Sequence, residues 1–245
     1  MATIDLNRAP VPNPVGAINP CAACTVRDMS ICQVLDDGEL QRLADIATNM
    51  TLDARQPVID EGEDAAFLFN VTSGTVKLYK LLPDGRRQIT GFLYGGDFLG
   101  ITMNENYAYS AEAVNKVTLC RFPRSKFETL LTALPNLEKR LLSAASNELV
   151  QAQDQMVLLG RKTAKEKIVS FLLSLSSRQE TRGGEPSPVN LPMSRADIAD
   201  YLGLTTETVS RTFSSLKRQK NIRLLDGGMV DLPNIDALKN LADGY

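Results

Sequence analysis

Histidine and tryptophan are absent from this sequence, and only 6% of its 245 residues are aromatic. Without histidine the chain cannot form a Ser-His or Cys-His nucleophile, a histidine proton shuttle or most of the zinc sites used for hydrolysis. These absences argue against a hydrolase.

Long hydrophobic runs are also absent. No apolar stretch approaches the roughly 20 residues that cross a bilayer, and the first 20 residues lack the apolar core of a signal peptide. We expect a cytoplasmic protein with no membrane partner. With 43% hydrophobic and 23% charged residues, the chain can bury a core, and its length predicts two modest domains.

Charge of either sign is nearly balanced, with a net charge of -2, but it is unevenly distributed. Residues 161–223 contain 12 lysines and arginines and only 6 acidic residues, so this segment is basic and the remainder is acidic. A basic module on an acidic body is typical of a protein that contacts the phosphates of double-stranded DNA through one domain.

The pattern along the chain predicts an α+β protein. The proline-rich residues 1–20 are typical of a flexible arm, and apolar residues at helical spacing predict a helix over 36–50. Short apolar stretches separated by glycines then predict an antiparallel β-roll, in which residues 75–81 and 86–93 pair across a turn. We divide the chain into a flexible arm with a cysteine segment (1–35), a β-roll sensor domain (36–134), a dimerisation helix (135–160) and a winged helix-turn-helix DNA-binding domain (161–245).

The dimerisation helix is predicted from a narrow apolar seam. Its spacing of three and four residues is typical of a contact between two helices, and so predicts a homodimer. The alternative is that the seam packs only on its own β-roll. The residues that we assign to the dimer interface are Leu141, Ala145, Leu149, Ala152 and Met156.

Two short helices joined by a glycine turn are predicted in the basic segment. Ser194 is placed to cap the first helix, Gly203 to end it and Thr205 to cap the second. On the second helix one stripe is apolar and the other is polar, so the polar stripe, which includes Glu207, Ser210 and Arg211, should be exposed. Arginine can bond guanine, and glutamate can accept from cytosine. The alternative is that Glu207 and Arg211 form only a solvated helix pair. A hairpin wing is predicted over 223–232. Together with the absences above, this predicted DNA-reading module and the lack of a nucleotide-binding glycine motif lead us to expect no catalytic residue and a protein that is not an enzyme.

Four cysteines form the second candidate site, namely Cys21, Cys24, Cys32 and Cys120. In a reducing compartment such a set indicates metal or redox chemistry rather than disulfides. Four thiolates suit either zinc or an iron–sulfur cluster, and their spacing does not choose between the two. Alternatively, Cys120 is a buried strand thiol that takes no part.

Several motifs together resemble the CRP/FNR superfamily of bacterial regulators, and within it the fumarate-and-nitrate-reduction (FNR) type. The motifs are the cysteine set, Arg87-Gln88-Ile89-Thr90-Gly91-Phe92, Gly96-Asp97-Phe98-Leu99-Gly100, Pro135-Asn136-Leu137 and the run from Tyr201 to Arg211. The resemblance implies a cyclic-nucleotide-binding-like β-roll, a dimerisation helix and a winged helix-turn-helix. It also implies that the four cysteines hold a [4Fe-4S] cluster whose loss in oxygen weakens the DNA-binding dimer.

The same resemblance implies how DNA is read. Glu207, Ser210 and Arg211 match the base-reading residues of the family, Thr206 lies beside them, and TTGAT-N4-ATCAA-like palindromes are the expected targets. The turn at Asp84-Gly85 resembles a surface that contacts RNA polymerase. We expect an activator of anaerobic or microaerobic genes.

Two departures from the family pattern qualify this picture. Seven residues, 25–31, separate the second and third cysteines, as in the FnrL/FnrN-like branch. Where the cyclic-nucleotide branch has an Arg-Ser pair, this chain has Tyr109-Ser110, so we expect no cyclic nucleotide partner. The rival interpretations are a cluster-free FixK-like regulator, a zinc or thiol redox regulator and, more remotely, an iron–sulfur electron carrier.

Overall fold

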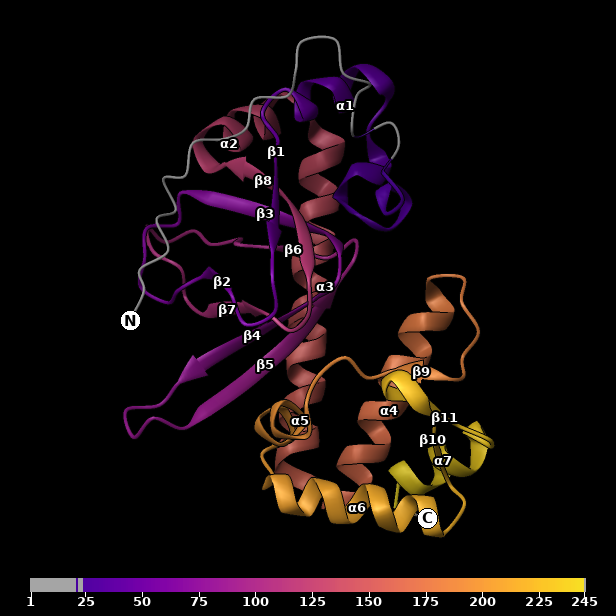
Figure 1. Ribbon diagram of the computed structural model, residues 1–245. Coiled ribbons are helices and arrows are strands. Elements are labelled where there is room, and N and C mark those ends of the chain that lie inside the picture. Colours follow the sequence, from indigo (N-terminus) through magenta and orange to yellow (C-terminus); the bar gives the residue numbers. More distant parts are fainter. Residues whose placement is uncertain (1–20, 22–23, 245) are drawn as a thin grey trace. The chain divides into compact units, whose positions relative to one another are not determined.

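The computed structural model describes residue 21 and residues 24–244 (Figure 1). The chain divides into two compact units, Met1–Val76 with Leu93–Ala144 and Lys77–Phe92 with Ala145–Tyr245. The arm predicted over residues 1–20 lies outside the described residues. No helix in the described part of the chain is long and apolar enough to cross a membrane.

Antiparallel strands form the framework of the N-terminal half. They are β1 (Thr48–Leu52), β2 (Pro57–Ile59), β3 (Phe67–Ser73), β4 (Thr75–Leu81), β5 (Arg87–Tyr94), β6 (Phe98–Leu99), β7 (Ser110–Ala113) and β8 (Val117–Pro123). They lie in two sheets with the orders β1-β8-β3-β6 and β2-β7-β4-β5. The predicted turn between β4 and β5 forms, with the Gly85 amide donating to the Leu82 carbonyl at 2.9 Å and Gly85 at a positive φ of 85°. The predicted sheet-rich β-roll is confirmed.

Short helices close one end of this unit. They are the 3-10 helices η1 (Arg27–Met29) and η2 (Ile31–Val34) and the α-helices α1 (Asp37–Ala44) and α2 (Arg124–Ala133). Leu40 and Leu43 of α1 pack in one buried cluster with Phe122 and Phe127. The prediction of a single helix over 36–50 was wrong, because residues 48–52 pair with β8 as strand β1.

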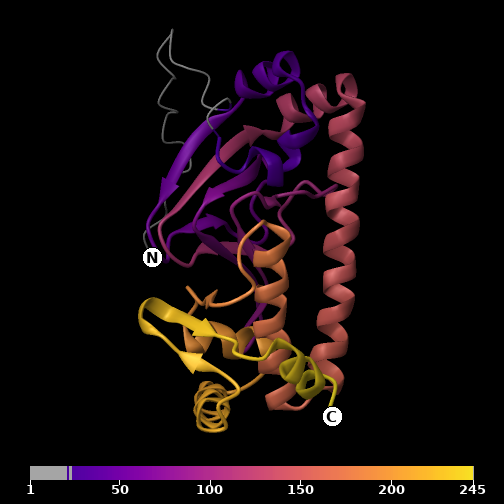
Figure 2. The same cartoon turned by 90° about the vertical axis from the view of Figure 1, so that its right-hand side faces the viewer.

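The long helix α3 (Pro135–Arg161) begins at a proline, which is favoured in the first turn because that position needs no amide donor (Figure 2). Its predicted start is confirmed. The helix continues through Gly160, where a side chain would meet open space.

The C-terminal unit contains a helix-turn-helix with a small sheet. Its helices are α4 (Ala164–Thr181), α5 (Arg195–Leu202), α6 (Thr206–Arg218) and α7 (Ile235–Ala242), and its strands are β9 (Val189–Asn190), β10 (Arg223–Leu224) and β11 (Met229–Asp231), with the 3-10 turn η3 (Asp226–Gly228) between the last two. The predicted wing is the β10–β11 hairpin, and β9 adds a third, unpredicted strand beside β11. Ile168, Leu172, Ile198, Leu202 and Phe213 are among its fully or almost fully buried core residues.

Candidate functional site

Helix α5 and helix α6 are joined by the glycine turn that the sequence predicts. Ser194 accepts from the Asp197 amide at 3.0 Å, and together they form the predicted capping box at the start of α5. Gly203 ends α5 in the left-handed conformation, with a φ of 62°, and Thr205 caps α6 by accepting from the Thr208 amide. These local bonds fix where each helix begins and ends.

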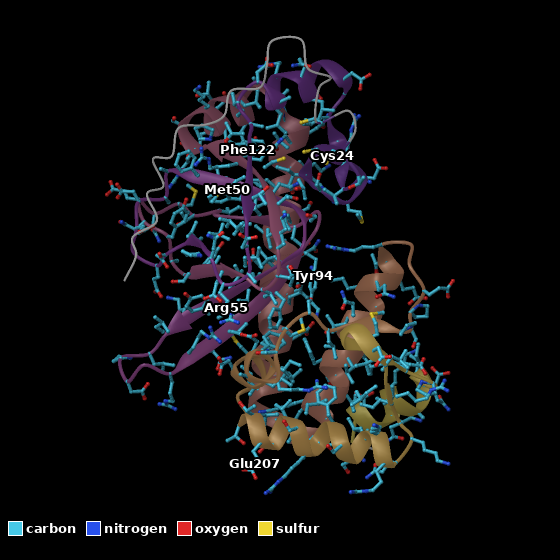
Figure 3. All side chains as sticks on the ribbon, viewed as in Figure 1. Cys24, Met50, Arg55, Tyr94, Phe122 and Glu207 are labelled. Atoms are coloured by element: carbon cyan, nitrogen blue, oxygen red, sulfur yellow. The ribbon has the colours of Figure 1, made fainter. Side chains whose placement is uncertain are left out.

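The two faces of α6 have opposite character. Val209, Phe213 and Leu216 are at most 2% exposed and anchor the helix in the core of its unit. The predicted DNA-binding residues Thr206, Glu207, Ser210 and Arg211 are all exposed. Glu207 lies on the outer side of α6 (Figure 3). The burial pattern therefore leaves this polar face free to meet a partner.

Glu207 and Arg211 form an exposed ion pair one helical turn apart. Such a pair contributes only about 0.3–0.5 kcal/mol to the stability of a helix. Both side chains can therefore leave this pair for another partner at little cost.

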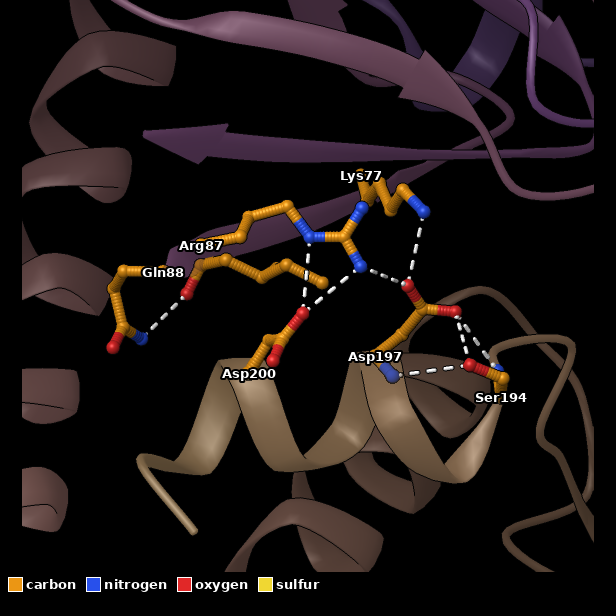
Figure 4. A network of polar contacts seen from close by, with 7 residues as sticks. Lys77, Arg87, Gln88, Ser194, Asp197 and Asp200 are labelled. Carbon is orange, nitrogen blue, oxygen red and sulfur yellow. Dashed lines mark hydrogen bonds and ion pairs between the residues drawn. The ribbon is translucent and has the colours of Figure 1, made fainter. Parts of the chain in front are cut away.

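A network of polar contacts joins α5 to residues of strands β4 and β5 (Figure 4). Asp197 Oδ1 accepts from Lys77 Nζ at 2.9 Å and from Arg87 Nη2 at 3.0 Å, and Arg87 also reaches Asp200. Burial raises the pKa of Asp197, but hydrogen bonds from Ser194 and Lys77 outweigh it and hold the pKa below its ordinary value. The site was not predicted from the sequence, because its four charged residues come from segments about 110 positions apart.

The cysteine segment is shaped by local turns. The Cys24 amide donates to the Cys21 carbonyl at 3.4 Å, and the Arg27 amide donates to the Cys24 carbonyl at 3.2 Å. Ser30 Oγ accepts from the Cys32 amide at 3.1 Å and so starts η2. These bonds fold the seven intervening residues back on themselves, which brings the third cysteine towards the first two.

The fourth cysteine, Cys120, comes from β8 and lies in register with Asn49 of β1 and Asn70 of β3. Cys21, Cys32 and Cys120 all pack against the same hydrophobic cluster, which contains Phe122. The structure thus places Cys120 beside the N-terminal cysteine segment, although about 90 residues separate them in the chain.

Burial raises the pKa of Cys120 to about 12 and that of Cys21 to about 11, and it also raises the pKa of Cys32. The charged form of each neighbouring cysteine is a further cause: all three raise the pKa of Cys120, Cys32 and Cys24 raise that of Cys21, and Cys24 raises that of Cys32. The four sulfurs therefore share one electrostatic neighbourhood. No disulfide joins them.

The donor atoms in this neighbourhood decide whether it can hold a metal group. Four thiols are the donor set that zinc or an iron–sulfur cluster takes, and the buried Asn70 Oδ1 beside Cys120 has no hydrogen-bond partner among the described residues. Within that same part of the chain, no three cysteine or carboxylate side chains already have metal-binding geometry. The donors fit in kind and in neighbourhood, and binding would have to draw the thiols together and displace their protons.

The predicted dimer-interface residues do not share one environment. Leu149 is 61% and Met156 is 70% exposed, and Ala152 is exposed as well. Leu141 instead packs against the hydrophobic cluster of the N-terminal unit, and the neighbouring Leu142 is 71% exposed. Leu142 was not among the predicted interface residues, although its seven-residue spacing from Leu149 is visible in the sequence.

Comparison with known proteins gives matches over both units. Residues 166–241 match the Crp-like helix-turn-helix domain, and residues 50–133 match the cyclic nucleotide-binding domain. The nitrogen fixation regulation protein FixK of Bradyrhizobium diazoefficiens is 42% identical over 220 residues, which are 89% of this chain and 93% of that protein. The transcriptional activator protein FnrL of Cereibacter sphaeroides is 38% identical over 84% of this chain and 85% of its own length.

Two further relatives extend the comparison. The fumarate and nitrate reduction regulatory protein of Yersinia pestis is 32% identical over 91% of this chain and 90% of that protein. The solved structure of FixK2 from Bradyrhizobium japonicum superposes with a TM-score of 0.75 at 37% identity, over 80% of this chain and 97% of that chain. These relatives are regulators, which confirms the prediction that this chain is not an enzyme.

Proposed function

Because the chain belongs to the CRP/FNR family of transcription regulators, we propose that it binds DNA as a homodimer and regulates anaerobic genes in response to oxygen. The single observation that supports the DNA-binding part best is the exposed polar face of α6, set on a buried apolar face. Regulators of this family bind DNA and act as dimers, so the finer parts of the proposal concern which bases are read and what is sensed.

In the proposed complex, α6 lies in the major groove. Arg211 would bond guanine, Glu207 would accept from cytosine, and Ser210 and Thr206 would contact bases or phosphates. Two protomers would read TTGAT-N4-ATCAA-like half-sites about one helical turn apart. The basic surround of α6 supplies the attraction to phosphates that does not depend on sequence.

Arg211→Ala tests the reading face. We expect it to weaken operator binding by about 1–3 kcal/mol while binding to a scrambled duplex changes much less, measured by fluorescence anisotropy at fixed salt. Lys239→Ala is the matched control, because Lys239 also pairs with an acid on its own helix, α7, outside the reading face. If both variants kept the wild-type preference for the operator, the assignment of α6 would be refuted.

For the sensor, we propose that Cys21, Cys24, Cys32 and Cys120 hold a [4Fe-4S] cluster. The support is the electrostatic neighbourhood that all four share and the packing of Cys21, Cys32 and Cys120 on one hydrophobic cluster. The resemblance to the FNR type implies that such a cluster supplies the sensitivity to oxygen. In this arrangement Cys120 ties the cysteine segment to strand β8, and burial raises the pKa of Cys21, Cys32 and Cys120, so that a metal would have to displace their protons.

Anaerobic purification followed by iron, sulfide and zinc counting tests the sensor. We expect about four irons and four sulfides per chain, a brown colour that fades in air, and loss of both in Cys120→Ser, as four thiolate ligands require. Gln33→Ala, which removes an exposed side chain from the same segment and leaves all four thiols and the Ser30 cap, is the control. A colourless protein with unchanged operator binding would overturn the cluster.

A cluster-free regulator is the second candidate. The observation in its favour is that the described cysteines do not already have metal-binding geometry, and relatives named FixK are among the similar proteins. The same purification separates the two, since a cluster-free regulator would bind its operator equally well with and without air. One zinc per chain would instead identify a zinc-thiol regulator.

We also propose that the β-roll takes no cyclic nucleotide. Ser110 is buried, and its Oγ accepts from the Glu61 amide at 3.0 Å, while Tyr109 Oη accepts from the Gly100 amide at 3.0 Å. These contacts occupy the side chains where the resemblance expects a phosphate-binding Arg-Ser pair. Addition of cyclic AMP should leave the melting temperature unchanged, whereas a rise would show binding.

The turn between β4 and β5 is the proposed contact with RNA polymerase. Asp84 and Arg86 pair across it, and Leu81 and Leu82 beside it are 61% and 40% exposed. A charged turn with exposed leucines offers a small mixed surface to a protein partner. Asp84→Ala should lower transcription in vitro without changing operator affinity.

A further inference from the structure

The hairpin from Lys77 to Phe92 belongs to the same compact unit as the helix-turn-helix. Its two strands continue, at Val76 and Leu93, into the N-terminal unit. The hairpin is therefore a covalent connection between the two units in addition to helix α3. Its contacts with α5 determine whether the hairpin can fix the orientation of that helix.

The first layer of contacts is ionic (Figure 4). Two cations of the hairpin, Lys77 and Arg87, meet two carboxylates of α5, Asp197 and Asp200, at 2.9–3.0 Å. The charges cancel, and the side chains of Lys77 and Asp197 are only 7% and 11% exposed. Buried ion pairs are weak evidence for stability, but where both partners are satisfied they favour one orientation over others.

The carboxylate of Asp197 has two different tasks. Its Oδ2 accepts from the Ser194 hydroxyl and amide at the start of α5, whereas its Oδ1 accepts from Lys77 and Arg87. One side chain thus joins the cap of the helix to the hairpin. Asp200, three residues later on the same face, gives the arginine a second acceptor and so fixes the rotation of α5 about its own axis.

A second layer follows the ionic one. Gln88 Nε2 donates to the Tyr201 carbonyl at the end of α5, at 3.3 Å. The ring centroid of Phe92 lies 5.3 Å from that of Tyr201 and 6.2 Å from that of Phe171 in α4. In addition, Arg178 of α4 donates a hydrogen bond to the Phe92 carbonyl at 3.2 Å. The hairpin therefore contacts α5 at both ends and α4 as well.

Helix α5 in turn packs on α6. From these contacts we propose that Lys77 and Arg87 are positioning residues for DNA reading: they hold α5, and through it α6, in the orientation that fits the major groove. The residues themselves do not touch DNA. This inference rests on the proposed reading role of α6 and adds that operator affinity is set partly by a hairpin of the preceding half of the chain.

The test compares two neighbouring arginines. Arg87→Gln removes a cation that contacts α5, while Arg86→Gln removes one whose ion-pair partner among the described residues is Asp84, at the exposed turn. Both substitutions change the net charge equally. We expect Arg87→Gln to weaken operator binding about tenfold relative to Arg86→Gln, with little change on a scrambled duplex. Equal operator affinity of the two variants would overturn the proposal.

Further measurements separate positioning from simple loss of folding. Arg87→Lys, which keeps the cation but not the two-pronged contact, should have an intermediate affinity. Asp200→Asn should weaken binding less in the Arg87→Gln background than in the wild type, because the two residues act through one contact. In each variant the melting temperature is measured, and hydrogen exchange should be faster in α5 and α6. Wild-type exchange in these helices would also overturn the proposal.

Arg211→Ala, run in the same series, distinguishes the two hypotheses. If Arg211→Ala loses operator preference and Arg87→Gln keeps it, the positioning role is wrong and the reading role stands. If Arg211→Ala keeps it, the reading role itself is wrong, whatever Arg87→Gln does.

Discussion

Leu149→Ala tests the proposed homodimer through α3. In the single chain Leu149 is 61% exposed, and complete burial of a leucine is worth about 2–3 kcal/mol, so covering the remaining surface contributes about 1.5 kcal/mol. A two-fold interface contains the residue twice, which makes the loss about 3 kcal/mol per dimer, or roughly 100-fold in the dissociation constant. Sedimentation equilibrium over a range of protein concentrations measures the dissociation constant of the dimer.

Two controls separate the interface from general destabilisation. Met103→Ala removes a side chain that is 97% exposed outside α3, and it should leave the dissociation constant unchanged. Leu141→Ala should lower the free energy of unfolding instead, because Leu141 packs on the hydrophobic cluster of its own chain. If Leu149→Ala dimerised as tightly as Met103→Ala, or Leu141→Ala weakened the dimer more, the interface would be misplaced.

The remaining predictions concern acid and backbone geometry. Since bonds from the helix cap and from Lys77 hold the pKa of Asp197 below its unfolded value despite burial, its charge stabilises the fold above about pH 4, and this contribution is lost as the pH falls through the lower folded pKa. Asp197→Asn should therefore flatten the decline of unfolding free energy in acid, followed by circular dichroism, and an unchanged slope would contradict this. Gly74→Ala should cost about 1–3 kcal/mol more than Gly85→Ala in urea, because both have positive φ but only at Gly74 would the new Cβ meet backbone atoms. Equal urea midpoints would refute the steric argument.

The helix-turn-helix could be predicted from the sequence because its signals are local. Each cap acts within three or four residues: Ser194 with Asp197, Thr205 with Thr208, and Gly203 at the end of α5. The alternation of buried and exposed positions on α6 also needs only the helical period. Such signals depend little on the rest of the fold.

Strand β1 shows where local reasoning fails. The helix predicted from the apolar spacing before it extends to residue 50, yet residues 48–52 form a strand because Thr48 lies opposite Arg121 of β8 in an antiparallel ladder. The network around Asp197 was missed for the same reason, since the sequence marks this residue as part of a helix cap and carries no sign of Lys77. In both cases the structure depends on contacts between segments that are far apart in the chain. A short stretch of the sequence does not contain both partners of such a contact.

The seam of α3 shows a finer limit. The predicted line through Leu141 and the heptad line through Leu142 share every later position from Ala145 onwards, and adjacent helix positions differ by only about 100° in direction. Periodicity therefore locates the seam but not which leucine begins it. Burial decides, because Leu141 packs on the core of its own unit while Leu142 is left exposed. A partner helix would thus meet Leu142, Leu149 and Met156, seven residues apart, and the dimer contact would begin where the chain's own core ends.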